Sequence, residues 1–311
     1  MSARLTISLT GGLGNQLFQY AALLHLGEGK KLGLTQDFGR PRAQVNGKAE
    51  LFAFNLDCEV VGYKQSFLGE KFAGYLLRLG VHRKFWEIRP IMRALATISG
   101  SIYLTLLNRR VIVIKGYSAL GHSEKFTLGP FTNLVVGYFQ NARWVLDQRV
   151  RTKLMKLSLV DSTVKFEDLV NEAETDLPLV VHVRLGDYKK EEDFGILPDS
   201  YYEVAIERAW KSGTYGKVWL FSDEPGEALA KIPIKLRSFV RTIDSSFSPA
   251  EALELMMHGK GYVIANSTFS WWGAMLSHSE NAPVFAPEKW FKGLNDPEHL
   301  IPDGWERVRS W

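Results

Sequence analysis

The sequence is poor in cysteine and has no long apolar run. Cys58 is the single cysteine among 311 residues, so no disulfide can form within the chain and a reducing compartment is expected. The nearest candidate for a membrane span, at residues 94–107, is shorter than the roughly 18 to 20 residues that cross a bilayer. The N-terminal MSARLTISL is too short and too polar for a signal peptide. We therefore expect a cytoplasmic protein in which Cys58 is a small buried residue rather than a nucleophile.

Familiar metal and phosphate motifs are also missing. The sequence contains no DxD, no HExxH and no Cys/His spacing of a zinc site, and its 7 histidines are scattered. The glycine-rich segment Gly11–Gln16 lacks the G-K-[ST] ending of a P-loop, and no complete G-x-G-x-x-G occurs. We accordingly expect no metal ion and no other cofactor.

The composition is that of an ordinary globular protein, with 46% hydrophobic and 23% charged residues, which excludes a disordered chain. The 38 Lys and Arg against 34 Asp and Glu give a net charge of +4, which does not suggest a nucleic-acid binder. Basic residues are frequent between residues 67 and 93. They form either a solvated helical face, which we favour, or a surface that contacts the inner face of the membrane peripherally.

At 311 residues the chain exceeds the usual size of one domain, so we expect two α/β domains, with one large α/β domain as the alternative. The first begins with a strand at Leu5–Leu9, a glycine-rich turn and a helix. In the second half, strands at 179–184, 218–221 and 262–265 alternate with helical patterns, which predicts a doubly wound parallel sheet. We assign residues 1–160 to an N-terminal domain and 175–295 to a second domain, and we expect residues 296–311 to pack back on the first.

The segment LVVHVRLGDY, residues 179–188, ends a buried strand in a polar cluster. If the strand continues, His182 and Arg184 lie on one face and Val183 on the other. A permanently charged guanidinium beside a group that titrates near neutrality suits phosphate binding. The equally weighted alternative is an Arg184–Asp187 ion pair that caps the strand, with His182 merely packed.

Two further strand ends carry polar residues. Ser222 and Asp223 follow one strand, and Asn266, Ser267, Thr268 and Ser270 follow another. Because the carboxyl ends of parallel strands share one edge of a sheet, we expect all three clusters to meet in one crevice. Asp223 suits ring N–H groups or ribose hydroxyls, or it caps the next helix. Trp271 and Trp272 are predicted core residues.

The glycine-rich turn of the first half precedes Asn15 and Gln16, two amides at a helix start. A strand, a glycine-rich turn and a helix can point N–H groups at an anion. Asn15 is either a ligand-binding residue or a simple N-cap.

Taken in order, the segments TGGLGNQLFQYAAL, VGYFQNARW, VHVRLGDY, LPDSYYEVAI, FSDEP and IANSTFSWWGAML resemble the bacterial α-1,2-fucosyltransferases of glycosyltransferase family 11. The resemblance covers nearly the whole chain. It implies a GT-B-type fold, two Rossmann-like domains with a cleft between them, and a role in glycan or O-antigen biosynthesis. It further implies GDP-fucose as co-substrate, inverting transfer without a metal ion, and a galactose-terminated oligosaccharide as acceptor.

The resemblance also implies residue roles. Arg184 binds the donor diphosphate, His182 lies beside the nucleotide, Asp187 orients Arg184, and Asn15 lies near the reacting sugar. The expected catalytic residues are Arg184, Asn15 and Asp187. The expected GDP-fucose contacts are Gly12, Gly14, Asn15, Gln16, His182, Arg184, Ser222, Asp223, Asn266, Ser267, Thr268, Phe269 and Ser270.

The general base is not identified by the sequence. Candidates are Asp187, Glu191, Glu192 and Asp193, with an unactivated acceptor hydroxyl as a further option. For Asp187 we favour an orienting role, since a carboxylate paired with a guanidinium is a weak base. Two departures from the family pattern are Met275 in place of a Trp and Glu224 in place of an Asp. The alternatives in function are a fucosyltransferase of different linkage or acceptor, and a GDP-sugar-binding protein without catalysis.

Overall fold

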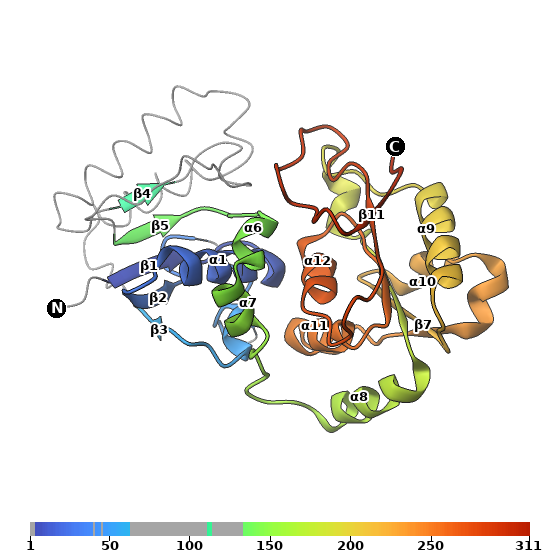
Figure 1. Ribbon diagram of the computed structural model, residues 1–311, viewed down its shortest axis with the longest axis horizontal. Coiled ribbons are helices and arrows are strands. Elements are labelled where there is room, and N and C mark those ends of the chain that lie inside the picture. Colours follow the sequence, from blue (N-terminus) through green and yellow to red (C-terminus); the bar gives the residue numbers. More distant parts are fainter. Residues whose placement is uncertain (1–3, 40, 45, 63–110, 114–132) are drawn as a thin grey trace. The chain divides into compact units, whose positions relative to one another are not determined.

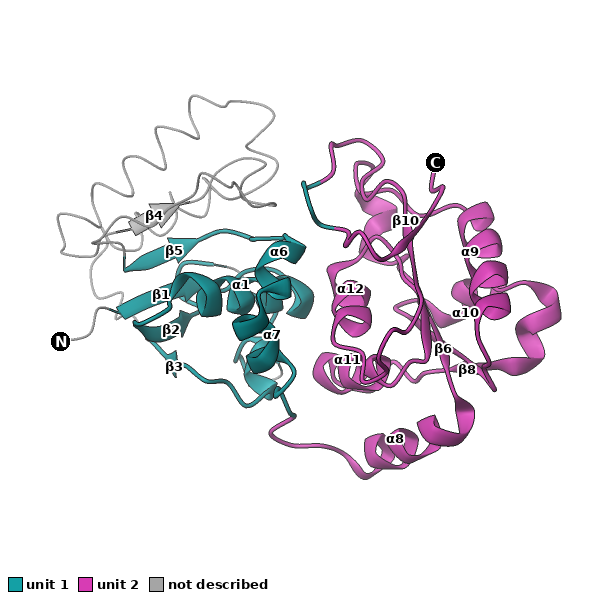
Figure 2. Ribbon diagram, in the orientation of Figure 1, with its two compact units in different colours: residues 1–158, 297–300 teal, residues 159–296, 301–311 magenta. Residues whose placement is uncertain are grey.

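A computed structural model describes residues 4–39, 41–44, 46–62, 111–113 and 133–311. The chain divides into two compact units, Met1–Ser158 with Pro297–Leu300, and Leu159–Asp296 with Ile301–Trp311 (Figures 1 and 2). We call these unit 1 and unit 2. The basic segment at 67–93 and the apolar segment at 94–107 lie outside the described residues. Within the described parts, no helix has the length and hydrophobicity to cross a membrane.

Unit 1 is built on a parallel sheet with the strand order β3-β2-β1-β5-β4 in the part of the chain described. Its elements are β1 (Arg4–Ser8), α1 (Leu13–Leu26), β2 (Lys31–Thr35), η1 (Glu50–Ala53), β3 (Glu59–Val60), β4 (Val111–Val113), β5 (Leu134–Val136), α6 (Ala142–Leu146) and α7 (Gln148–Leu154). The central strand β1 pairs with β2 and β5, and its Leu5 and Ile7 are fully buried. Strand, turn and helix thus follow one another as the sequence predicts.

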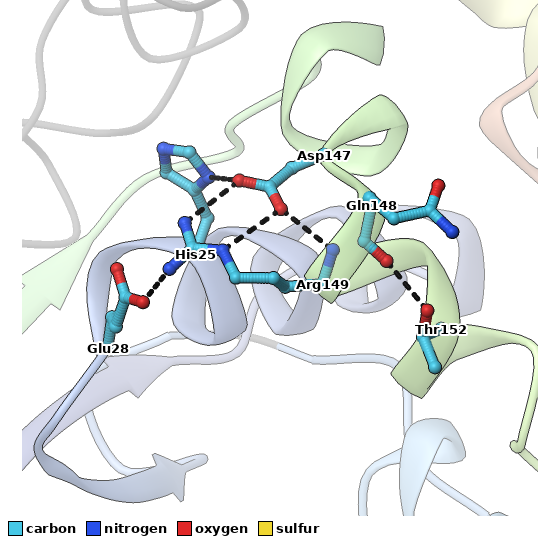
Figure 3. A network of polar contacts seen from close by, with 6 residues as sticks. All are labelled: His25, Glu28, Asp147, Gln148, Arg149 and Thr152. Carbon is cyan, nitrogen blue, oxygen red and sulfur yellow. Dashed lines mark hydrogen bonds and ion pairs between the residues drawn. The ribbon is translucent and has the colours of Figure 1, made fainter.

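The sequence suggests one helix from Ala142 to Leu157, but the structure has two. Asp147 ends α6 and caps α7, because its carboxylate accepts a hydrogen bond from the main-chain nitrogen of Arg149 at 2.9 Å. The same carboxylate lies 3.0 Å from Nδ1 of His25 in the last turn of α1 (Figure 3). Arg149 also forms an ion pair with Glu28. The break therefore allows Asp147 to tie α1 to α7.

Unit 2 is built on a second parallel sheet, of order β11-β10-β9-β6-β7-β8 among the described residues. Its elements are α8 (Val164–Asp176), β6 (Leu179–Val183), η2 (Asp187–Lys190), α9 (Asp199–Ser212), β7 (Val218–Ser222), α10 (Pro225–Ala228), η3 (Leu229–Lys231), η4 (Ile234–Phe239), β8 (Val240–Thr242), α11 (Pro249–Met257), β9 (Gly261–Val263), α12 (Thr268–Met275), β10 (Val284–Pro287) and β11 (Glu306–Val308). The predicted doubly wound α/β class, with two Rossmann-like units, is confirmed.

The end of the chain differs from the expectation. Residues 296–311 were expected to return to the N-terminal domain, yet β11 pairs in parallel with β10 and extends the sheet of unit 2. Only Pro297–Leu300 groups with unit 1, where the main-chain oxygen of His299 accepts a hydrogen bond from the nitrogen of Ala142 at 2.9 Å. Pairing with β10, in the sheet of unit 2, thus determines where residues 306–308 lie.

Alternation along β6 separates two faces of the sheet of unit 2. Leu179, Val181 and Val183 join one core cluster with residues of α9, so Val180 and His182 point to the opposite face. Helices α9 and α10 lie on one side of the sheet, and α11 and α12 on the other (Figure 2). The side chain of His182 therefore faces α12. Trp271 and Trp272 of that helix are fully buried, as predicted.

Candidate functional site

Three neighbouring strands of unit 2 end in polar residues. β6 lies between β9 and β7 and pairs in parallel with both. Arg184 follows β6, Asp223 follows β7, and Ser267 follows β9. The expectation that these strand ends share one edge of the sheet is confirmed. We call this edge, with the first turn of α12, the strand-end site.

Arg184 is held between two carboxylates. Its Nε and Nη2 lie 2.9 and 2.8 Å from Oδ1 of Asp187, and its Nη1 lies 3.2 Å from Oδ2 of Asp223. The side chain of Arg184 is 19% exposed, whereas that of Asp187 is 50% exposed. Burial lowers the pKa of Arg184, but the two carboxylates outweigh it, so the pKa rises and the group stays charged. One buried cation thus has one fixed and one solvent-facing partner.

Asp223 is directed toward β6 rather than toward its own helix. Its Oδ1 accepts a hydrogen bond from the main-chain nitrogen of Leu185 at 3.0 Å, and α10 is preceded by Glu224 without a side-chain cap. The alternative that Asp223 merely caps this helix is therefore wrong. A Cβ on Gly186 would lie 2.5 Å from Oδ2 of Asp223, so a larger residue there would force the carboxylate to shift. Ser222 turns its hydroxyl to the nitrogen of Glu224 at 3.0 Å.

His182 does not titrate near neutrality, contrary to the expectation from sequence. Burial, with a smaller contribution from the charge of Arg184, lowers its pKa to about 3, although Asp223 opposes the shift. The ring is 4% exposed, and its centroid lies 6.0 Å from that of Phe269. Its buried Nδ1 has no hydrogen-bond partner in the structure. The site thus offers a neutral imidazole beside Arg184, not a second cation.

The first turn of α12 uses part of its polar groups internally. Ser267 caps the helix, because its hydroxyl accepts a hydrogen bond from the nitrogen of Phe269 at 3.4 Å. The hydroxyl of Ser270 donates to the main-chain oxygen of Ser267 at 3.3 Å and is buried. Thr268 and Phe269 are half-buried. Of the hydroxyl residues predicted here, Thr268 is the more accessible.

Asn266 holds loops together. Its amide nitrogen lies 2.9, 3.1 and 3.2 Å from the main-chain oxygens of Phe194, Gly195 and Trp290. Its own main-chain oxygen accepts a hydrogen bond from the hydroxyl of Tyr188 at 2.9 Å, and its side chain is buried. The amide nitrogen of Asn266 thus holds the loop after η2 in place. Asn266 therefore contributes to the strand-end site through its hydrogen bonds to main-chain oxygens.

In unit 1, Gln16 is likewise occupied by the backbone. Its amide nitrogen donates to the main-chain oxygens of Gly11 and Arg42 at 2.8 and 3.0 Å, and its oxygen accepts from the nitrogen of Leu51 at 2.8 Å. The side chain is fully buried. Gln16 therefore joins the glycine-rich turn to the segment before η1.

The start of α1 already has an anionic group. The main-chain nitrogen of Leu13 donates to Oε2 of the buried Glu50 at 2.7 Å. Gly12 caps the helix, and Gly14 is buried within its first turn. A phosphate at this helix start would meet the carboxylate of Glu50. The guanidinium of Arg42 also approaches this turn, since a Cβ on Gly12 would lie 3.7 Å from its Nη1, so anion binding by the glycine-rich turn stays a prediction.

Asn15 is not the N-cap of α1, since Gly12 takes that position without a side-chain hydrogen bond. The side chain of Asn15 is half-buried, and its Oδ1 accepts a hydrogen bond from Nε2 of Gln140 at 2.7 Å. Gln140 follows β5, the neighbour of β1. The two amides thus lie at the carboxyl ends of adjacent parallel strands, where α/β sheets bind ligands.

Sequence reasoning assigned no role to Gln140, Gln19 or Glu50. Gln19 accepts a hydrogen bond from the nitrogen of Thr10 at 3.0 Å and donates to the oxygen of Gly137 at 2.8 Å, so it joins the loops after β1 and β5. A signal existed for Gln140, which lies in the segment VGYFQNARW. The sequence carries no signal for Glu50, because this residue lies 37 positions along the chain from Leu13, whose nitrogen it contacts.

Two α/β units with polar strand ends are typical of enzymes that bind nucleotides or their sugars, and the comparisons identify the class as glycosyltransferases. The model of Glycosyl transferase family 11 matches residues 99–293, more than half of the chain. The chain belongs to this family.

Two curated relatives extend along almost the whole chain. The O-antigen biosynthesis glycosyltransferase WbnK of Escherichia coli is 28% identical over 315 residues, which cover 96% of this chain and 98% of WbnK. An alpha-1,2-colitosyltransferase of Escherichia coli is 26% identical over 317 residues, which cover 97% and 98%. Among solved structures, the fucosyltransferase NodZ from Bradyrhizobium is 14% identical, with a TM-score of 0.46 and coverage of 89% and 94%. That likeness is too distant to bear on function.

The neutral state of His182 can be tested by NMR. Because burial holds its pKa at about 3, we expect its ring proton signals to stay unchanged between about pH 5 and 8, where an ordinary histidine titrates. The signals are assigned by their loss in His182→Asn. A titration midpoint near 6.5 would contradict the neutral assignment.

The contact between Gly186 and Asp223 predicts a severe effect of one added methyl group. Gly186→Ala brings Cβ to 2.5 Å from Oδ2 of Asp223, so the carboxylate and with it Arg184 must move. A displacement of about 1 Å typically costs about 10²-fold in rate, and we expect sugar transfer to fall by that order. Gly226→Ala is the control, since a Cβ there meets nothing within 4 Å. Equal rates for both variants would sink this assignment of Asp223.

Proposed function

We propose that the protein is an inverting fucosyltransferase that moves L-fucose from GDP-β-L-fucose to the 2-hydroxyl of a terminal galactose in a glycan. The observation that carries the proposal is the strand-end site, where Arg184 is buried between two carboxylates beside a helix start. Membership of family 11 supports sugar transfer. The 1,2-linkage in the name of one curated relative supports the choice of hydroxyl.

Arg184 is the proposed contact for the donor diphosphate. A guanidinium binds two phosphate oxygens side by side, and it stays charged at every physiological pH. Its Nε and Nη2 edge now faces Asp187, whose side chain is half exposed. A phosphate oxygen can replace this carboxylate at small cost, because a half-exposed Asp187 regains water when it turns away.

The first turn of α12 is the second proposed phosphate contact. Its N–H groups and the residue Thr268 lie at the N-terminal end of the helix, where the helix dipole favours negative charge. The ring of Phe269, 6.0 Å from His182, closes the site on the face of the sheet that α12 covers. His182 adds a neutral ring there, which leaves Arg184 as the proposed source of positive charge.

Asp223 is proposed as a positioning residue. Its carboxylate contacts Arg184 and the nitrogen of Leu185. A carboxylate has about four acceptor positions, so a further hydrogen bond from guanine or a ribose hydroxyl is compatible with this role. Its removal would loosen Arg184 whether or not it touches the donor.

The proposed reaction is a single displacement. The acceptor oxygen forms a bond to the anomeric carbon of fucose as the bond from that carbon to the diphosphate breaks, and the hydroxyl proton passes to a base. Arg184 and the start of α12 stabilise the charge on departing GDP. Asp187 is proposed to orient Arg184 until the donor binds, and Asn15 is a further proposed contact to the reacting sugar. Glu191, Glu192 and Asp193 remain the candidate bases, and no metal ion is required.

The function is tested by incubating the protein with GDP-fucose and lactose in the presence of EDTA. We expect an α-1,2-linked fucoside, identified by NMR of the product. A product of another linkage would favour the alternative of a different fucosyltransferase. Binding of GDP-fucose without transfer to any galactosyl acceptor would favour a non-catalytic sugar-binding protein. GDP-colitose is a second donor to compare, because a curated relative is a colitosyltransferase and colitose is fucose without its 3-hydroxyl.

Arg184→Ala tests the proposed phosphate contact. Loss of one preorganised charged group typically costs about 10² to 10³ in rate, so we expect kcat to fall by this order and GDP to bind more weakly. Arg208→Ala is the control, because the side chain of Arg208 in α9 is 55% exposed and pairs with the exposed Glu306 of β11. Transfer that survives Arg184→Ala unchanged would overturn the role given to Arg184.

A further inference from the structure

A cluster of two histidines and one glutamate lies at the end of α11. Glu254 is in the last turns of this helix, and His258 is the residue that ends it. The two are four residues apart, which places their side chains on one face of the helix. His278 follows α12, and its main-chain nitrogen donates to the oxygen of Met257 at 2.8 Å. Two separate segments of unit 2 therefore bring three metal-ligating side chains together.

The distances within the cluster are close to those of a metal site. One ligand atom from each of Glu254, His258 and His278 lies within 4.8 Å of the other two. Nε2 of His278 is 3.1 Å from Oε1 of Glu254, and the two imidazole centroids are 4.7 Å apart. Ligand atoms around a tetrahedral zinc ion, at bond lengths of roughly 2.0 to 2.2 Å, are about 3.3 Å apart. Small side-chain rotations would bring all three to this spacing.

One carboxylate oxygen of Glu254 is buried without a hydrogen-bond partner. Oε1 faces His278, but Oε2 is buried and has no hydrogen-bond partner in the structure. A simple surface pair of histidine and glutamate would leave the second oxygen in water. Burial, and less strongly the neighbouring His278, lower the pKa of His258, while Glu254 opposes the shift. Nearby Lys260 and Glu174 act on this ring with opposite sign.

We propose that Glu254, His258 and His278 form a zinc-binding site. Two imidazoles and one carboxylate suit zinc, whereas magnesium and calcium prefer oxygen ligands alone. The side chain of His278 is 40% exposed and gives an ion access from solvent. Three protein ligands leave the fourth position for water, so an exchangeable ion is expected.

The place of the site in the fold separates it from the proposed sugar transfer. The strand-end site uses the start of α12 at Ser267, whereas His278 follows the end of that helix. A helix of 8 residues is about 12 Å long, so an ion at its far end does not touch the donor. It would instead join the end of α11 to the segment after α12 and stabilise unit 2. This inference does not depend on the identity of the transferred sugar.

The site is tested on the full chain, freed of metal with EDTA and dialysed. Titration calorimetry with zinc chloride should give one zinc ion per chain. Zinc at about 100 times its Kd should raise Tm by about 5 °C, because an ion that binds the folded state stabilises it by mass action. Magnesium chloride at the same concentration should give no shift. Absence of stoichiometric zinc binding by the wild type overturns the proposal.

Variants identify the ligands. Glu254→Gln and His278→Asn should each weaken zinc binding at least about 10-fold, because each removes one of three ligands. The control is His25→Asn: His25 forms the other carboxylate pair, with Asp147 at 3.0 Å (Figure 3), but no third ligand of this kind lies beside it among the described residues. Its zinc binding should match the wild type.

A second measurement guards against loss of fold in a variant. Cobalt chloride bound to the wild type and to His25→Asn should show the intense visible absorption of a tetrahedral or five-coordinate ion, and both ligand variants should lose it. His278 is exposed, so His278→Asn should keep the zinc-free Tm of the wild type. Zinc affinity that is unchanged in both ligand variants, or lost equally in His25→Asn, contradicts the site.

Discussion

The pairing of Arg184 with Asp187 and Asp223 is the interaction on which the strand-end site depends. A guanidinium that is four-fifths buried is stable only with charge partners, and the closer-packed partner comes from the neighbouring strand β7. Asp223 also accepts a hydrogen bond from the backbone after β6. The requirement to neutralise one cation therefore fixes the ends of two strands against each other, and a side chain larger than glycine at residue 186 would push the Asp223 carboxylate out of this position.

Buried amides impose a comparable constraint on the loops of both units. Backbone groups that leave a strand end must find partners when they are buried. Gln16 and Gln19 supply these partners after β1 and β5, and Asn266 supplies them to the loops after η2 and β10. The amides that resemble ligand-binding groups in the sequence thus belong largely to the framework. They hold in place the segments next to Asn15, Gln140 and Thr268.

The elements that follow from local pattern were predictable, and the partners of polar side chains were not. Strand alternation and the parallel sheet rule brought the three strand ends of unit 2 to one edge. By contrast, the carboxylate at the start of α1 comes from Glu50, and the carbonyls that hold Asn266 come from Phe194, Gly195 and Trp290. Such contacts between distant residues leave no periodic signal. The pKa of His182 depended on burial by another helix, which its position on β6 alone does not give.

The charge of the strand-end site bears on how a donor would enter. Arg184 with two carboxylates sums to one negative charge, so an incoming diphosphate would meet net repulsion while both carboxylates stay in place. Asp223 is fixed by the backbone of Leu185, whereas Asp187 is half exposed and begins the short turn η2. Displacement of Asp187 is therefore the change that turns the site from negative to neutral. In the proposed function, Asp187 would orient Arg184 before the donor binds and give way to a phosphate oxygen when it does, so that both roles belong to one contact.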